Sequence, residues 1–192
     1  MRLFVALDIS AAVREELAGL LAQLRSISTE TKDKTPRWVR AESLHVTLKF
    51  IGEAAPEKLA GIREALAAVR LRDPLALAFR RLGFFPDEKR PRVLWVGIEA
   101  LPGLPALASN IEKSLEKIGF PREQRKFTPH LTLARFERPG LHEKVRAAIE
   151  QNAERNFGSY STDEFHLIES KLKSSGAEYT TVQSFRFTVA EG

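Results

Sequence analysis

The 192-residue chain contains no cysteine, which excludes disulfide bonds, thiolate nucleophiles and zinc sites with cysteine ligands. It also lacks a long hydrophobic run. The apolar start reaches only to Asp8, which is too short for a signal peptide or a membrane span. No glycine-rich phosphate loop follows any predicted strand, so Rossmann and Walker types of nucleotide binding have no support. We therefore expect a globular cytoplasmic protein that does not interact with membranes.

The residues that are present describe a folded chain with a modest excess of positive charge. Apolar residues make up 43% of the sequence, which is enough for a full core. The net charge of +5 is compatible with ordinary solubility and also with a polyanionic partner. Basic residues over 122–126 lead directly into the second histidine motif described below, and this placement favours a phosphate-bearing ligand.

Hydrophobic periodicity predicts an alternation of strands and helices along the whole chain. Helices are predicted after an N-cap at Ser10, from Pro56 to Val69, over 104–118, and around 143–152. Strands are predicted at 3–8, 44–51, 75–80, 93–98, around 130, and at 161–169, 179–184 and 185–189. Hairpin-like returns favour an antiparallel α+β fold. The second half repeats the first loosely, so we expect one domain, residues 1–192, of two intimately packed pseudo-symmetric lobes facing each other across a cleft.

The most informative pattern is a pair of motifs that both read His-aliphatic-Thr-Leu. The first contains His45 and Thr47, and the second contains His130 and Thr132. In a β-strand the side chains at i and i+2 point to the same face, so each motif presents an imidazole and a hydroxyl to one surface. Packing requires only the aliphatic positions on the other face. The repeated histidine and threonine therefore favour a function.

Two imidazoles in one cavity suit the in-line cleavage of a phosphodiester. A neutral imidazole can take a proton from the attacking water, and a protonated one can give a proton to the leaving oxygen. The ordinary pKa of histidine, roughly 6.5, lets both forms exist near neutral pH. Threonine hydroxyls can donate hydrogen bonds to the non-bridging phosphate oxygens. Metal binding is the rival use, but two histidines with two hydroxyls lack the third strong ligand usual in catalytic zinc centres. We therefore expect no metal.

These motifs resemble those of the two-histidine (2H) phosphoesterases, and most closely those of the bacterial and archaeal RNA 2′,3′-cyclic phosphodiesterases, formerly called 2′-5′ RNA ligases. The matching segments are 45–53 and 129–135, with support at 1–7, 37–39, 92–97 and 169–179. The resemblance implies a bilobal, pseudo-twofold α+β fold with two antiparallel sheets and flanking helices around a central groove. It also implies that terminal 2′,3′-cyclic phosphates of RNA are opened to 2′-phosphates without metal, ATP or another cofactor. Joining of 2′-5′ ends would be the reverse reaction.

The same resemblance suggests a role for each motif residue. His45 corresponds to the proton donor that protonates the leaving 3′ oxygen. His130 corresponds to the proton acceptor that activates water. Thr47 and Thr132 correspond to hydrogen-bond donors to the phosphate.

The residues after the motifs are harder to place. In the family pattern Arg135 binds the phosphate and Phe50 lies near the base, although core packing is the alternative for Phe50. In a regular strand both side chains would point away from the histidine face, so these roles require a β-bulge or the end of the strand. By the same regular alternation, Lys49 would lie on the histidine face and either help to bind the phosphate or reach solvent.

The expected partners are RNA ends or nucleotides with a 2′,3′-cyclic phosphate, and we expect a monomer. Two alternatives remain open. One is a 2H esterase for another small cyclic phosphate, and the other is a non-catalytic module on the same scaffold that binds nucleotides or RNA. Binding alone needs no matched acid and base, which argues against the module.

Overall fold

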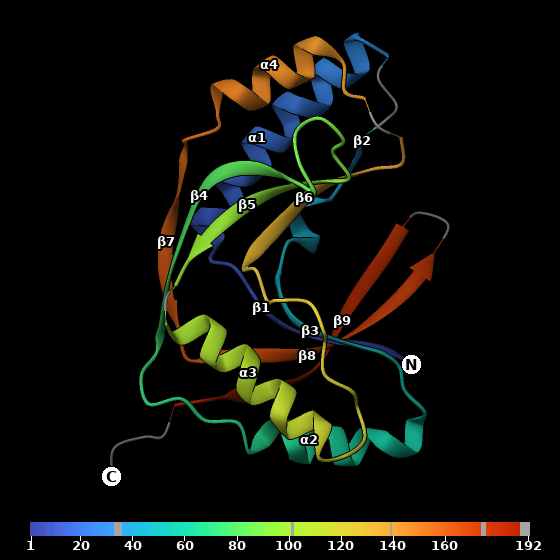
Figure 1. Ribbon diagram of the computed structural model, residues 1–192, viewed down its shortest axis with the longest axis vertical. Helices are drawn as coiled ribbons and strands as arrows, with labels where there is room; N and C mark the ends of the chain where they lie inside the picture. Colours follow the sequence, from blue (N-terminus) through green and yellow to red (C-terminus); the bar gives the residue numbers. More distant parts are fainter. Residues whose placement is uncertain (33–35, 101, 139, 174–175, 189–192) are drawn as a thin grey trace.

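The computed structural model describes residues 1–32, 36–100, 102–138, 140–173 and 176–188, and in these ranges it contains nine strands and four α-helices (Figure 1). The strands are β1 (Arg2–Leu7), β2 (Pro36–Trp38), β3 (Val46–Glu53), β4 (Leu75–Phe85), β5 (Val93–Glu99), β6 (His130–Phe136), β7 (Asn156–Thr162), β8 (Glu164–Lys173) and β9 (Gly176–Arg186). The helices are α1 (Ala11–Glu30), α2 (Leu59–Ala67), α3 (Gly103–Glu116) and α4 (Glu143–Gln151), with short 3₁₀ helices η1 (Ala41–Ser43) and η2 (Pro56–Lys58).

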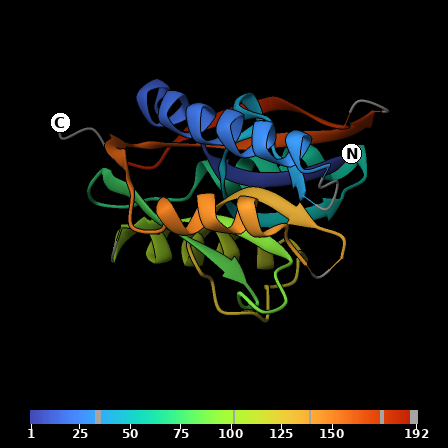
Figure 2. The ribbon, with the colours of Figure 1, turned by 90° about the horizontal axis from the view of Figure 1, so that it is seen from above.

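The strands form two antiparallel sheets, with the orders β3-β1-β8-β9 and β2-β6-β5-β4-β7. Helices α2 and α3 pack together against the first sheet, where α3 contacts β3 and α2 contacts β9. Helices α1 and α4 lie side by side at the other end of the molecule, where α1 contacts β7 and β2 (Figures 1 and 2). The predicted fold class, an antiparallel α+β fold with two sheets and flanking helices, is confirmed.

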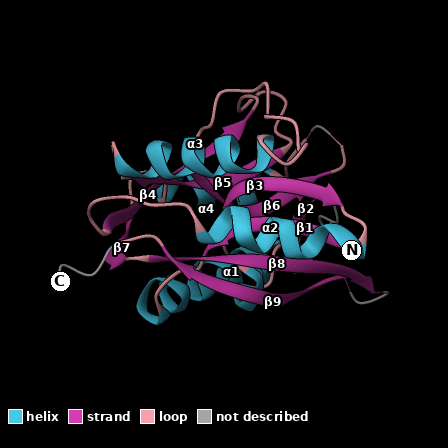
Figure 3. Ribbon diagram, turned by 90° about the horizontal axis from the view of Figure 1, so that it is seen from below, coloured by secondary structure: helices cyan, strands magenta, loops and turns pink. Residues whose placement is uncertain are grey.

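Each sheet combines strands from both ends of the sequence. The first sheet joins β1 and β3 to β8 and β9, so the two ends of the chain lie next to each other in it. Figure 3 shows the long β8 and β9 strands running together beside helix α2. The second sheet in turn takes β2 from the N-terminal part of the chain. Neither sheet could form from one half of the sequence alone.

The first helix illustrates how the sequence specifies the elements. The Ser10 hydroxyl accepts a hydrogen bond from the Val13 backbone N–H at 3.3 Å, which caps the N-terminus of α1. The apolar stripe that begins at Val13 and continues through four leucines is buried against the second sheet and α4. Burial of each such leucine stabilises the fold by about 1.5–3 kcal/mol. No helix within the described residues is both long and apolar enough to span a membrane.

Three strand predictions need correction, and one strand was missed. The single strand expected at 161–169 is two strands, β7 and β8, which separate at Asp163. Strand β4 continues to Phe85, five residues beyond the predicted end at Arg80, because it pairs with β5 over that length. The short edge strand β2 was not predicted at all. It starts with a proline, which has no N–H to donate, and its pairing with β6 makes it a strand. Of the strand expected at 185–189, only Phe185 and Arg186 are in a strand, as the end of β9, and Val189 lies outside the described residues.

Candidate active site

The six residues predicted for the site all line one cavity of about 440 Å³. The cavity lies where β3 of the first sheet contacts β6 of the second. Strand β3 contributes Thr47 and Phe50, and His45 stands directly before its first residue. Strand β6 contributes His130, Thr132 and Arg135. The fold thus brings the two motifs to one place although they lie far apart in the sequence.

A β-bulge in each motif strand turns the later residues into the cavity. The register of β3 against β1, and that of β6 against β5, shifts just after the threonine of each motif. Leu48 and Leu133 are the extra residues, and both are buried. Because one added residue reverses the alternation of faces, Phe50 and Arg135 point to the histidine side. The bulge that their predicted roles required is present in both strands.

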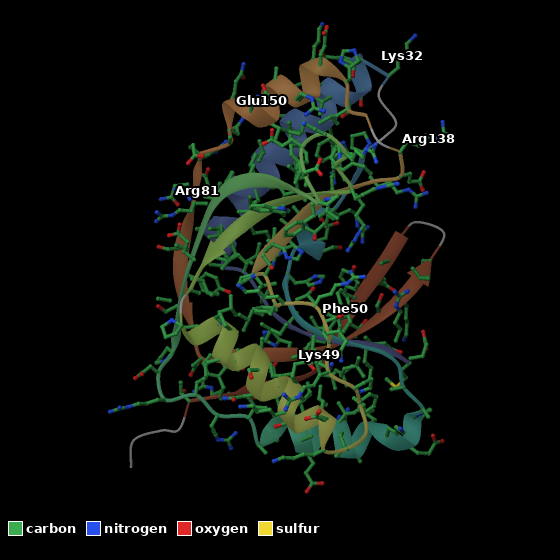
Figure 4. The ribbon with its side chains drawn as sticks, in the orientation of Figure 1. Lys32, Lys49, Phe50, Arg81, Arg138 and Glu150 are labelled. Atoms are coloured by element: carbon green, nitrogen blue, oxygen red, sulfur yellow. The ribbon has the colours of Figure 1, made fainter. Side chains whose placement is uncertain are left out.

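The same bulge makes the prediction for Lys49 wrong. Its side chain is only 4% exposed and points away from the cavity towards α3 (Figure 4). The ammonium donates to Glu112 Oε2 at 2.6 Å and to the Pro121 carbonyl at 2.8 Å. Lys49 therefore lies on the core side of β3 and does not contact a ligand in the cavity. It joins β3 to α3 and to the segment that leads to His130.

A backbone carbonyl fixes the orientation of each catalytic candidate. His45 Nδ1 lies 2.8 Å from the Ser43 carbonyl, and His130 Nδ1 lies 2.7 Å from the Thr128 carbonyl. A carbonyl can only accept, so Nδ1 carries the hydrogen in both rings. The Nε2 atom is then the nitrogen that gains or loses a proton. The two motifs therefore present the same atom for proton transfer.

Aromatic side chains hold both imidazole rings. Phe4 lies 4.7 Å from the His45 ring, between ring centroids, and Tyr179 packs edge-on against the same ring at 5.1 Å. Phe85 packs edge-on against His130 at 5.0 Å. These contacts come from β1, β9 and β4, so three further strands restrict the motion of the two rings.

Burial and local charges act on His45 in opposite directions. Desolvation lowers the pKa of His45 below its ordinary value of 6.5, and this is the largest effect. The Ser43 carbonyl and the Asp8 carboxylate favour the protonated ring and raise the pKa. The positive charges of Arg135 and Arg14 lower it. The balance lowers the pKa, so protonated His45 is a stronger acid than free imidazolium.

The cavity presents positive charge. Arg2 and Arg135 line it together with the two histidines, and none of the described residues that line it is acidic. Within the described part of the chain, neither arginine forms a hydrogen bond or an ion pair. Unpaired guanidinium groups favour an anionic ligand. In the described ranges, no group of three or more His, Cys, Asp or Glu side chains could hold a metal ion.

Sequence reasoning did not single out three of the residues around this cavity, namely Arg2, Ser43 and Tyr179. Arg2 and Tyr179 lie in the segments 1–7 and 169–179, which resemble the family, but the resemblance alone gives neither residue a role. Ser43 contacts the site through its backbone carbonyl, and no side-chain pattern reveals such a contact.

Two antiparallel sheets with flanking helices, arranged around such a cavity, are the fold of a 2H phosphoesterase. A sequence model of the 2′-5′ RNA ligase superfamily matches residues 4–173, and the chain belongs to this superfamily. An RNA 2′,3′-cyclic phosphodiesterase of Archaeoglobus fulgidus is 34% identical over 185 residues, which cover 96% of this chain and 99% of the relative.

Solved structures show the same likeness over the full length. The protein TT0787 of Thermus thermophilus superposes with a TM-score of 0.81 at 28% identity, and the match covers 100% of both chains. LigT of E. coli in complex with 3′-AMP superposes with a TM-score of 0.71 at 28% identity, and the match covers 98% of each chain.

Proposed function

We propose that this protein hydrolyses the 2′,3′-cyclic phosphate at RNA ends to a 2′-phosphate without a metal ion, with His45 as proton donor and His130 as proton acceptor. The observation that carries the proposal is one cavity that holds both imidazoles and both motif threonines and whose lining, among the described residues, is free of acidic side chains. The name of the Archaeoglobus relative, RNA 2′,3′-cyclic phosphodiesterase, supports the same substrate.

The proposed step transfers two protons. Neutral His130 accepts a proton at Nε2 from a water molecule, whose oxygen attacks the phosphorus. The bond from phosphorus to the 3′ oxygen breaks, and protonated His45 gives its Nε2 proton to that oxygen. The products are a 2′-phosphate and a 3′-hydroxyl. Proton exchange with solvent then returns both imidazoles to their starting protonation states. Each positioned proton transfer is typically worth about 10²–10⁴ in rate.

The remaining cavity residues would stabilise the charge on the phosphate. Thr47 and Thr132 donate hydrogen bonds to its non-bridging oxygens, and Arg135 adds a charge-assisted contact. Phe50 is 65% exposed although it is aromatic, which suits stacking with the base. If a 5′-hydroxyl of a second RNA replaces water, the same transfers give a 2′-5′ bond.

The direct test uses two substrates, a 2′,3′-cyclic mononucleotide and an oligoribonucleotide with a cyclic end, both in excess EDTA. We expect both to be hydrolysed, and chromatography against standards should identify the product as the 2′-phosphate. Three results would refute the proposal: turnover of neither substrate, activity only when a divalent metal is restored, or release of the 3′-phosphate.

The pH dependence of the reaction should reflect the environment of His45. A proton donor acts only in its protonated form, so kcat/KM falls as pH rises through the pKa of His45. Because burial lowers this pKa below 6.5, the decline should begin on the acidic side of neutrality. A bound phosphodiester anion stabilises the protonated ring, so the decline in kcat should lie at higher pH than the decline in kcat/KM.

Initial rates for a 2′,3′-cyclic mononucleotide, measured across the acidic and neutral range, check this. The variant D8N removes a charge that raises the pKa of His45, so the decline in kcat/KM should move to lower pH. A D8N profile that coincides with the profile of the unaltered protein would contradict the role of His45 as donor.

A further inference from the structure

Arg2 is a cavity residue for which the proposed reaction has no use. It lines the same cavity as the two histidines, and its guanidinium forms no hydrogen bond or ion pair within the described residues. In the proposed reaction, Arg135 and the two threonines already bind the reacting phosphate. A second free guanidinium in the cavity indicates a second anionic group on the ligand.

The position of Arg2 on β1 fixes where this second anion would lie. Strand β1 pairs without a break against β8 from Leu3 to Ala6, which puts Phe4 and Ala6 on one face, and Arg2 at the start of β1 continues this alternation. Ala6 pairs with Thr47 at the reacting end of the cavity. Arg2 lies four residues away, or roughly 13 Å along a strand. An arginine side chain that reaches back along β1 shortens this separation, so a ligand with a second phosphate beside the reacting one could contact both ends of the cavity.

The surface between the two cationic ends is apolar. Phe4 lies halfway along β1 and pairs with Phe50, with ring centroids 6.1 Å apart. Phe50 and Leu172, which are 65% and 75% exposed, line the same cavity. Such large exposed apolar side chains suit the flat face of a base. The order along the cavity is therefore phosphate site, apolar surface, free cation.

Nearby negative charge does not satisfy Arg2. Its pairing partner across the sheet is Glu53, whose carboxylate is 78% exposed and lies 3.6 Å from the N-terminal ammonium. Glu53 does not line the cavity. A phosphate that enters the cavity would therefore meet Arg2 without first displacing an ion pair.

We propose that Arg2 binds the 5′-phosphate of the terminal nucleotide, and that this contact makes the protein prefer cyclic ends of RNA to nucleoside cyclic phosphates. The proposal rests on the proposed function, because it extends the same cavity by one phosphate. A phosphodiester and a phosphomonoester at the 5′ position both offer negatively charged oxygens to the guanidinium, so Arg2 should bind both.

The test compares three substrates with the same base: adenosine 2′,3′-cyclic phosphate, its 5′-phosphorylated form, and a dinucleotide that ends in the same cyclic adenosine. In the unaltered protein, kcat/KM for the two substrates with a 5′ phosphate should exceed that of the first by about 10- to 100-fold, the range expected for a hydrogen bond to a charged group. In R2Q this ratio should fall to near one. R2K should keep part of it, because lysine retains the charge without the forked donor geometry.

R186Q is the matched control. Arg186 is also a strand arginine, its side chain is 77% exposed, it faces an acidic partner, and it does not line the cavity. The substrate ratio in R186Q should equal that of the unaltered protein. A purely structural role of Arg2 would lower the rates with all three substrates together and leave the ratio unchanged.

Two results would overturn the proposal: an unaltered protein that shows no preference for the 5′ phosphate, or an R2Q variant that keeps the full preference. Either result is compatible with hydrolysis of the nucleoside cyclic phosphate, and in that case the proposed function still holds. If the unaltered protein hydrolyses none of the three substrates, the proposed function itself fails.

Discussion

Replacement of His130 by alanine should lower kcat by about 10²–10⁴, because the attacking water loses its proton acceptor. Replacement of His45 should have a similar effect on cyclic nucleotides, because the 3′ oxygen would then leave without a proton. The affinity for a 2′-nucleotide product should change little in H130A, since Arg135 and the threonines remain. H45A should bind this product more weakly, because it removes a ring whose protonated form a bound anion favours. Single-turnover rates and calorimetric Kd values measure the two quantities separately.

The nature of the leaving group distinguishes the two histidines. A nucleoside phosphodiester of p-nitrophenol releases a stable anion that needs no proton. H45A should therefore lose far less activity with this substrate than with a cyclic nucleotide, whereas H130A should lose about the same factor with both. The opposite pattern would exchange the donor and acceptor roles.

The control for both variants is H166Q. His166 bonds to the Ser184 hydroxyl at 2.9 Å and does not line the main cavity, so its replacement should keep the activity within a fewfold range. A double variant H45A/H130A should be hardly slower than either single variant, because residues that act as a unit have strongly non-additive effects. Losses that multiply would mean that the histidines act independently.

The candidate site could be predicted because the residues proposed for its chemistry lie close together in two short strands. His45 and Thr47 are two residues apart, as are His130 and Thr132, and this spacing alone puts each pair on one face. The aliphatic residues between and after them explain which face is buried. Repetition of the pattern then indicated that the two strands share one site, and all four side chains line one cavity.

The wrong prediction for Lys49 shows that a β-bulge cannot be read from the local sequence. The bulge at Leu48 depends on how β3 pairs with β1, a strand more than forty positions earlier in the sequence. The extra residue reverses the alternation of faces up to the second register shift, which follows Phe50, and this moved Lys49 into the core and Phe50 into the cavity. The resemblance to a family anticipated this for Phe50 and Arg135. Regular alternation gave the wrong face for Lys49.

The arrangement of the strands into sheets could not be predicted for a similar reason. Strand β2 is short and starts with a proline, so only its neighbour β6 makes it a strand. The placement of β8 beside β1, with β9 next to β8, joins the two ends of the sequence. This interlacing favours our proposal that residues 1–192 act as one domain, since separation of the halves would break both sheets.

Replacement of Glu112 by methionine should cause a large loss of stability. Lys49 is 4% exposed at its side chain, so the loss of its partner leaves a buried charge with only the Pro121 carbonyl. Removal of one partner of a buried ion pair typically costs about 3–5 kcal/mol. Glu112 is 17% exposed, which places the expected loss near the lower end.

Replacement of the other partner, K49M, should lower the free energy of unfolding clearly less than E112M does. The carboxylate that remains lies on α3 with part of its surface in water, so it can stay hydrated, whereas the ammonium of Lys49 cannot. Urea unfolding, followed by the intrinsic fluorescence of the two tryptophans, gives the free energies of unfolding. For a chain of this length, about 3 kcal/mol corresponds to a decrease in Tm of roughly 6–12 °C.

The double variant K49M/E112M tests the cause of this asymmetry. Two apolar residues of similar size often replace a buried ion pair without loss, so the double variant should be more stable than E112M alone. That recovery is the signature of a buried unpaired charge, since the loss of two independent contacts would add. If E112M costs less than about 1 kcal/mol, the pair behaves like an exposed surface pair. The explanation of the loss by a buried, unpaired ammonium of Lys49 would then be wrong.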